Sequence, residues 1–157
     1  MKTVLLMVGS TQDKHFQCLI EEYVSRVRHY IPFELSVIPQ LRDSRNLSPQ
    51  EQKEREGMLI LKTLQPGDCL VLLDERGTER RSTEFARWLE KRTASSPRRL
   101  VFLIGGPYGF SPAVYERADE QISLSQMTLS HQMVRLFFVE QLYRAFTILH
   151  HEKYHNQ

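Results

Sequence analysis

A glycine-rich segment contains the first residues whose types and spacing could do chemistry. Residues 100–104 form a short, unbroken apolar run that ends abruptly at residues 105–109, Gly-Gly-Pro-Tyr-Gly. This pattern is typical of a buried strand that delivers a tight loop to the edge of a sheet, where ligands bind. The glycines leave room for a ligand against bare backbone. The segment matches neither a Walker A nor a GxGxxG pattern, and an ordinary strand-to-helix turn explains it equally well.

Several charged residues are candidates for acid–base or electrostatic roles. Asp74 directly follows an apolar run, so it is either a general base or a turn residue. Glu140 and Arg144 are spaced i, i+4 in the favourable order, and Arg135 lies near them on the same predicted helix. A strip of polar side chains that bind one another explains this spacing without chemistry. Taken singly, none of these residues identifies a reaction.

Residues 151–155 match HExxH, the pattern in which two histidines one helical turn apart hold zinc. We reject this interpretation because two residues remain after His155, so no downstream ligand can complete the site. A frayed terminus also fixes metal geometry poorly. We expect no metal.

Length and composition predict one domain with a real core. The chain has 157 residues, is 41% hydrophobic and 25% charged, and carries a formal net charge of +2, so any nucleic-acid binding must come from a local patch. The apolar run at residues 4–8 is shorter than a signal peptide needs, and no later run approaches a membrane span. Cys18 and Cys69 have no CxxC spacing and fit two unpaired thiols. We expect a cytoplasmic protein that does not bind membranes.

Strands alternate with helices along the chain, which predicts an α/β fold with a mostly parallel sheet covered by helices on both faces. Ligands bind beyond the carboxyl ends of the strands in such sheets, and three strand ends fall together there, at Leu73-Asp74, Gly105-Gly106 and Leu124-Ser125. A mobile surface loop is expected over residues 40–47. The predicted strands span residues 4–8, 33–38, 69–73 and 100–104 and a short stretch near residue 122; the predicted helices span residues 13–29, 48–64, 83–91, 112–118 and about 131–150.

The final predicted helix is apolar nearly all round. One core face cannot absorb so many apolar side chains, so we expect part of the helix to be buried by a second chain or by another layer of the same chain. A homodimer is the simpler hypothesis. The alternative is a central helix that is wrapped within its own monomer.

Several of these segments, taken together, resemble the ribosomal RNA large subunit methyltransferase H family, which belongs to the SPOUT class of RNA methyltransferases. The resemblance covers essentially the whole chain as a single SPOUT domain, residues 1–157, and its glycine-rich and Leu-Ser-x-Met-Thr-Leu blocks are specific. It implies a C-terminal trefoil knot and a homodimer. The segments that carry it are Leu73-Asp74, residues 103–109, residues 124–131, Arg135, residues 140–145 and Tyr154-His155.

The resemblance also implies a reaction and a cofactor. The reaction is N3-methylation of a pseudouridine in 23S ribosomal RNA on the assembled ribosome, with S-adenosylmethionine as methyl donor and no metal. The residues expected to line the cofactor site are Leu73, Gly105, Gly106, Leu124, Ser125, Gln126, Met127, Thr128 and Leu129.

The catalytic and RNA-contacting residues follow from the same resemblance. His155, or a water held by Asp74, is the candidate acceptor of the imide proton, and Tyr154 is expected to stack on the target base or to order the tail. The family's terminal Tyr-His-Arg is Tyr-His-Asn here, so Asn156 removes an expected phosphate contact. The remaining candidates for contacting RNA are Arg42, Arg45, Arg135, Arg144 and Lys153.

Three other functions are compatible with the sequence. The chain could methylate another RNA, such as transfer RNA, although it lacks a separate RNA-binding domain. It could be a ribosome-associated factor that kept the fold and lost turnover, although the intact blocks at residues 105–106 and 124–129 argue against this. A nucleotide-binding protein of the doubly wound type has only the alternation of strands and helices in its favour.

Overall fold

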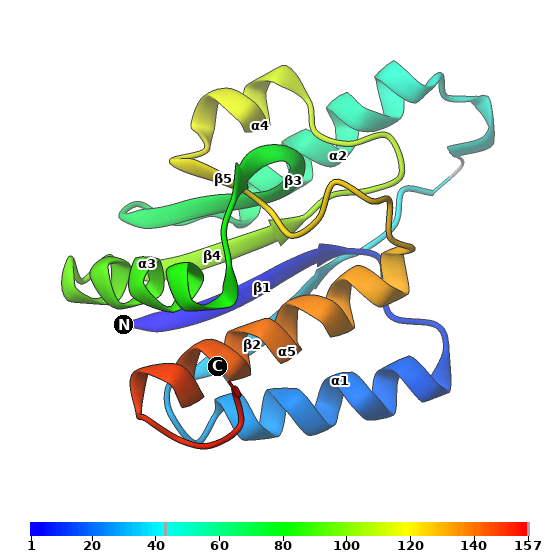
Figure 1. Ribbon diagram of the computed structural model, residues 1–157. Coiled ribbons are helices and arrows are strands. Elements are labelled where there is room, and N and C mark those ends of the chain that lie inside the picture. The colour runs from blue at the N-terminus through cyan, green and yellow to red at the C-terminus, as the bar shows by residue number, and fades with distance from the viewer. Residues whose placement is uncertain (43, 157) are drawn as a thin grey trace.

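Five strands form one parallel sheet in the computed structural model, which describes residues 1–42 and 44–156. The strand order is β2-β1-β4-β3-β5, and helices lie on both faces (Figure 1). The predicted fold class is therefore confirmed. The elements in chain order are β1 (Lys2–Val8), α1 (Lys14–Val27), β2 (Phe33–Ile38), the short 3-10 helix η1 (Ser44–Asn46), α2 (Pro49–Thr63), β3 (Asp68–Glu79), α3 (Ser82–Ala94), β4 (Arg99–Ile104), α4 (Pro112–Arg117), β5 (Glu120–Ser123) and α5 (His131–Leu149).

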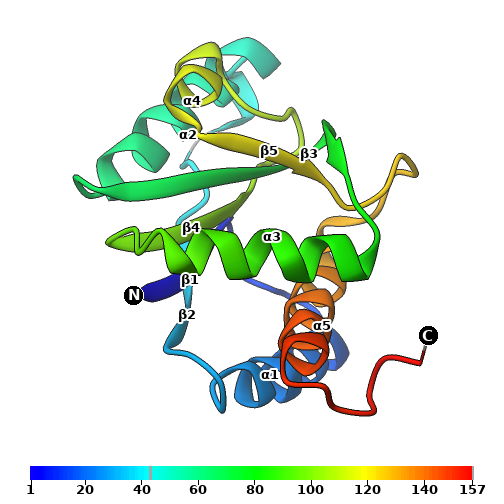
Figure 2. The ribbon, with the colours of Figure 1, turned by 60° about the vertical axis from the view of Figure 1, so that its left-hand side comes forward.

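The sheet separates two helical layers. Strand side chains alternate between its faces, so Leu5 and Met7 of β1 join one buried cluster while Val4 and Leu6 join the other. α1, α3 and α5 cover the first face, and α2 and α4 cover the second (Figure 2). Because both faces are covered, the strands are near-continuous apolar runs, as their sequences predicted.

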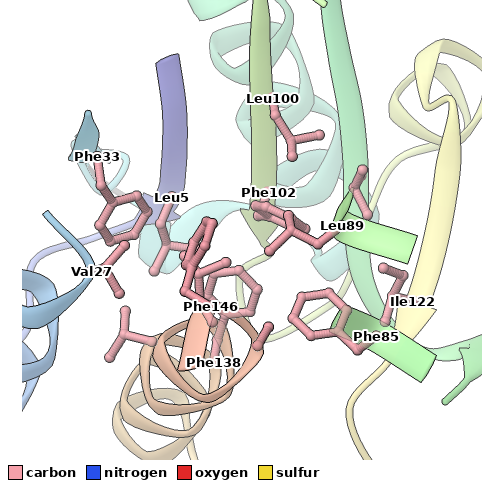
Figure 3. Close-up of a cluster of buried hydrophobic side chains, with 14 of the residues drawn as sticks. Leu5, Val27, Phe33, Phe85, Leu89, Leu100, Phe102, Ile122, Phe138 and Phe146 are labelled. Carbon is pink, nitrogen blue, oxygen red and sulfur yellow. The ribbon is translucent and has the colours of Figure 1, made fainter. Parts of the chain in front are cut away.

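Aromatic residues dominate the larger cluster (Figure 3). The ring of Phe102 on β4 is fully buried and lies 4.7 Å, centroid to centroid, from Phe138 of α5. The rings of Trp88 and Phe85 on α3 lie 5.9 and 6.4 Å from Phe102. These contacts fix α3 and α5 against the central strand whose carboxyl end carries the glycine-rich loop.

β3 is longer than predicted. The sequence predicted a strand that stops before Asp74, whereas β3 continues to Glu79. Its pairing with β5 is interrupted after Leu73 and resumes at Thr78, which pairs with Ile122. The polar segment in between is tolerated because β3 pairs with β4 only as far as Leu72, so beyond that residue the irregularity affects only the pairing with the edge strand β5. It displaces Asp74 and Glu75 from the regular ladder and leaves them beside the strand ends.

α5 obtains most of its cover from its own chain. It packs against both α1 and α3, and its buried apolar residues include Phe138, Leu142 and Phe146. Intramolecular packing therefore accounts for much of the apolar sequence that suggested a second chain. Val134, Leu136 and Phe137 remain partly exposed. The homodimer and the trefoil knot stay predictions.

The remaining differences are local. α3 spans Ser82–Ala94 rather than residues 83–91, because Glu84 accepts a hydrogen bond from the Arg81 backbone and starts the helix early. The predicted loop over residues 40–47 contains η1, and Asp43 within it lies outside the described residues. Among the described helices, none combines the length and apolar character needed to cross a membrane.

Truncation of Phe102 tests the role of the aromatic cluster. Phe102→Ala should lower the free energy of unfolding by about 3–5 kcal/mol, because it leaves a cavity between β4, α3 and α5. Phe102→Leu keeps most of the side-chain volume, so it should lower the free energy of unfolding clearly less than the alanine variant does. Urea denaturation followed by tryptophan fluorescence measures both, and a loss below about 1 kcal/mol for the alanine variant would contradict the packing described here.

Candidate active site

The ends of β3 and β4 and the segment after β5 enclose a cavity of about 500 Å³. This cavity confirms that the predicted strand ends meet. Its lining combines apolar side chains with exposed backbone from the three connections. The residues that we predicted for a cofactor site and that line it are Leu73, Gly105, Gly106, Leu124, Ser125, Met127, Thr128 and Leu129, whereas Gln126 is exposed and does not line the cavity.

The glycine-rich loop forms one wall of this cavity. It closes on itself through a backbone hydrogen bond of 3.1 Å from the Gly109 N–H to the Gly106 carbonyl. A Cβ atom at Gly105 would lie 2.8 Å from Cε1 of the buried Phe110 ring, and one at Gly106 would collide with Oε1 of Glu56. A side chain at position 105 would therefore meet the buried Phe110 ring, and one at position 106 would require the Glu56 carboxylate to shift.

The segment after β5 forms a second wall and is held by its own serines. The Ser125 hydroxyl accepts a hydrogen bond of 2.9 Å from the Met127 N–H, and the Ser130 hydroxyl caps α5 by accepting one of 3.2 Å from the Met133 N–H. Met127 is 79% exposed. An apolar side chain held at a cavity mouth without a partner is suited to cover a planar ligand.

Asp74 lies in the cavity beside Tyr115 of α4. One carboxylate oxygen accepts the Tyr115 hydroxyl, and the other accepts a hydrogen bond of 3.2 Å from the Arg76 N–H. Burial, together with the hydrogen bond to Asp74, raises the pKa of Tyr115 to about 12. Tyr115 therefore remains a donor at neutral pH and orients the Asp74 carboxylate.

Tyr154 and His155 do not line this cavity. The Tyr154 hydroxyl donates to Oε1 of Glu140 at 2.9 Å and lies 3.2 Å from the Tyr23 hydroxyl, and burial followed by these contacts raises its pKa above the ordinary value. His155 Nδ1 lies 3.1 Å from an Arg144 nitrogen, and His155 Nε2 is buried without a hydrogen-bond partner among the described residues. The two predicted tail residues are thus docked on α5 and α1 of their own chain.

The arginines and the lysine predicted to contact RNA divide into three groups. Arg42, Arg45 and Lys153 are exposed. Arg144 is half-buried, with its guanidinium paired to Glu140 at 2.7 Å and stacked over the Tyr154 ring at 4.7 Å. Arg135 is 2% exposed and donates to the Val8 carbonyl and the Thr11 hydroxyl, each at 2.9 Å. The charged group of Arg135 therefore lies inside the protein, so its predicted contact with RNA has no exposed group to make it.

Several side chains at the site were not predicted, including two in the cavity lining with acid–base chemistry and one behind the glycine-rich loop. Tyr115 and His131 line the cavity, and Glu56 supports the glycine-rich loop from α2. His131 had a usable signal, since it follows Ser130 at the start of a predicted helix directly after the block at residues 124–129. Glu56 had no such sequence signal, because its charged neighbours predicted a solvent-exposed face for this part of α2.

Comparisons with known proteins agree on one family. The family model described as "Predicted SPOUT methyltransferase" matches residues 1–155. A protein named ribosomal RNA large subunit methyltransferase H from Bacteroides fragilis (strain YCH46) is 56% identical over 157 residues, which is 100% of both chains. The proteins of the same name from Phocaeicola vulgatus and Parabacteroides distasonis are each 57% identical over the same full length.

A solved structure shows the same fold. A probable methylase family protein from Haemophilus influenzae Rd KW20 superimposes with a TM-score of 0.50 and 13% sequence identity. The match covers 95% of this chain and 66% of that one. At this identity the likeness concerns the fold alone.

The contact between Asp74 and Tyr115 predicts a pH dependence. The neutral phenol of Tyr115 is favoured in the folded state, so its contribution to stability is complete below pH 10 and is lost as the pH rises towards about 12. Asp74→Asn should move the Tyr115 pKa back towards 10, because the neighbouring negative charge is removed. The difference in phenolate absorbance between each protein and its Tyr115→Phe counterpart isolates this one tyrosine. An unchanged pKa in Asp74→Asn would contradict the assignment.

Proposed function

The chain belongs to the SPOUT methyltransferase family, as its motifs predicted, and from this premise we propose that it uses S-adenosylmethionine to methylate N3 of a pseudouridine in 23S ribosomal RNA. The observation that carries the proposal is the cavity in which the glycine-rich loop and residues 124–129 face one another. Because the proposed substrate is the assembled ribosome, we also propose a cytoplasmic location.

The cavity suits the proposed methyl donor. Its volume of about 500 Å³ falls in the usual range of small-molecule sites. Leu73, Met127 and Leu129 offer an apolar slot for the adenine, and the backbone between residues 124 and 129 offers donors and acceptors to its edge and to the ribose. Gly105 and Gly106 bring bare backbone to the cavity wall, against which the methionyl part can lie. When bound, S-adenosylmethionine would supply a methyl group already activated by its sulfonium.

The protein must then align the target base and accept its imide proton. Correct alignment is worth roughly 7–11 kcal/mol in well-oriented systems. Asp74 is the candidate that lines its own chain's cavity, where it could act directly or through a water, and the hydroxyl of Tyr115 fixes its orientation. His131 lines the same cavity and is a second candidate with the right chemistry.

A homodimer would give Tyr154 and His155 a catalytic role. They are held away from their own chain's cavity by Glu140, Arg144 and Tyr23, so they can reach a reacting base only in a partner's site. We therefore propose that the tail acts across a dimer interface formed around the partly exposed apolar residues of α5. With Arg42, Arg45 and Lys153 as exposed cations, the shaped ribosomal site would supply much of the RNA affinity.

Titration of S-adenosylmethionine tests the cofactor site. The wild-type protein should bind it with micromolar affinity in isothermal titration calorimetry, and Gly105→Ala should abolish binding because its methyl group meets the Phe110 ring. Tritiated methyl transfer to ribosomes that lack the modification then tests the reaction. A folded protein that binds no S-adenosylmethionine would refute the methyltransferase proposal and leave a ribosome-binding factor as the better account.

Mixed dimers test the role of the tail. Gly105→Ala and His155→Ala should each be inactive as homodimers, since one lacks the cofactor and the other lacks the proposed proton acceptor. If the tail acts across the interface, co-expression restores one complete site in each mixed dimer, which gives about a quarter of wild-type turnover under random pairing. If mixed dimers form but no turnover is recovered, the tail does not act in the partner's site, and this proposal is wrong. Wild-type turnover of His155→Ala at all pH values would exclude His155 as the base.

A further inference from the structure

A second cavity, of about 310 Å³, lies against the candidate active site. The two cavities share three residues, Gly106, Pro107 and His131, so the glycine-rich loop and the start of α5 form the boundary between them. The second cavity extends from this boundary towards the ends of β1 and β2 and the face of α2. No part of the proposed function so far uses it.

Two buried, oppositely charged side chains line the second cavity. Glu56 of α2 is 5% exposed, and Arg135 of α5 is 2% exposed. Across residues 1–42 and 44–156, neither of them takes part in an ion pair, with each other or with another residue. Apart from His131, the other described residues that line this cavity are uncharged.

The hydrogen-bonding capacity of both groups is incompletely used. Glu56 accepts one hydrogen bond of 3.1 Å from the Gln52 side chain, to Oε2, while Oε1 lies against Gly106. Arg135 uses its two terminal nitrogens on Thr11 and Val8, and its Nε is buried without a partner among the described residues. Burial also lowers the pKa of the Arg135 guanidinium from its ordinary value.

Buried charges of both signs around one cavity have a physical implication. An uncompensated buried charge is costly, and it persists where a ligand or partner completes it. A simple anion would be repelled by Glu56, and a simple cation by Arg135. A ligand that carries an ammonium and a carboxylate on neighbouring atoms would satisfy both side chains at once.

We propose that this cavity binds the zwitterionic amino-acid end of S-adenosylmethionine, with Glu56 receiving the α-ammonium and Arg135 the α-carboxylate. The inference rests on the proposed function, which places the adenosine part in the neighbouring cavity. Gly106, Pro107 and His131 line both cavities, so the methionyl chain would cross from one cavity to the other along this shared boundary. Glu56 thus has two tasks, since it also backs the loop that the ligand crosses.

Ligands with and without the amino-acid end test the proposal. S-Adenosylmethionine carries it, whereas 5′-methylthioadenosine keeps the adenosine and the sulfur-bound methyl group, lacks the amino-acid end and is neutral at sulfur. Both are titrated calorimetrically into wild type, Glu56→Gln and Arg135→Gln. The matched controls are Glu54→Gln and Arg55→Gln, which remove the same charges from exposed positions on α2.

Glu56→Gln and Arg135→Gln should each lower the affinity for S-adenosylmethionine by about 10-fold or more, because a charge-assisted hydrogen bond is lost. The affinity for 5′-methylthioadenosine should change by less than about 2-fold, as should both affinities in the two controls. The proposal would be overturned if the two cavity variants lost affinity for both ligands equally, or if neither affinity changed. If wild type binds neither ligand, the proposed function itself fails, which is a separate result.

If Arg135→Gln folds poorly, the proposal can still be tested by changing the ligand instead of Arg135. An S-adenosylhomocysteine analogue without the α-amino group should bind wild type about 10-fold more weakly than S-adenosylhomocysteine does. The same pair should bind Glu56→Gln with nearly equal affinity, because the carboxylate that reads the ammonium is gone. An undiminished difference in Glu56→Gln would exclude Glu56 as the ammonium partner.

Discussion

The passage of the chain between the Phe110 ring and the Glu56 carboxylate is the constraint on which the site depends. A Cβ atom at residue 105 would meet the buried Phe110 ring, and one at residue 106 would displace the Glu56 carboxylate. The loop is therefore pressed onto α2 and leaves its backbone facing two cavities. β4 can deliver the loop to this point because parallel pairing with β1 and β3 aligns the strand ends.

The two cavities differ in the kind of interaction they offer. The larger one is mixed, with apolar side chains from residues 73, 127 and 129 beside exposed peptide groups, and suits a nucleoside. The smaller one places Glu56 and Arg135 where little water can compensate them, and so favours a ligand with separated charges. The glycine-rich loop lines both cavities. Its conformation therefore affects the larger cavity and the position of the Glu56 charge in the smaller one.

α5 links the site to the tail. Its first turn supplies His131 and Arg135, its middle packs on Phe102, and its second half holds Tyr154 and His155 through Glu140 and Arg144. The helix is therefore apolar where it meets α1 and α3 and charged where the tail docks. Its uncovered apolar side chains are the part that a second copy could bury.

The sequence by itself determined the fold class and the element order, because strand and helix periodicity are local patterns. The resemblance of its glycine-rich and Leu-Ser-x-Met-Thr-Leu blocks to the family implied the cofactor-site residues, all of which except Gln126 line the larger cavity. The sequence misjudged the end of β3, since an edge irregularity followed by renewed pairing with β5 is a contact between distant residues. It also placed Arg135 among the candidates for contacting RNA and overlooked Glu56. Only the tertiary structure buried both beside one cavity and docked the tail away from its own site, because burial and charge pairing depend on which distant segments meet.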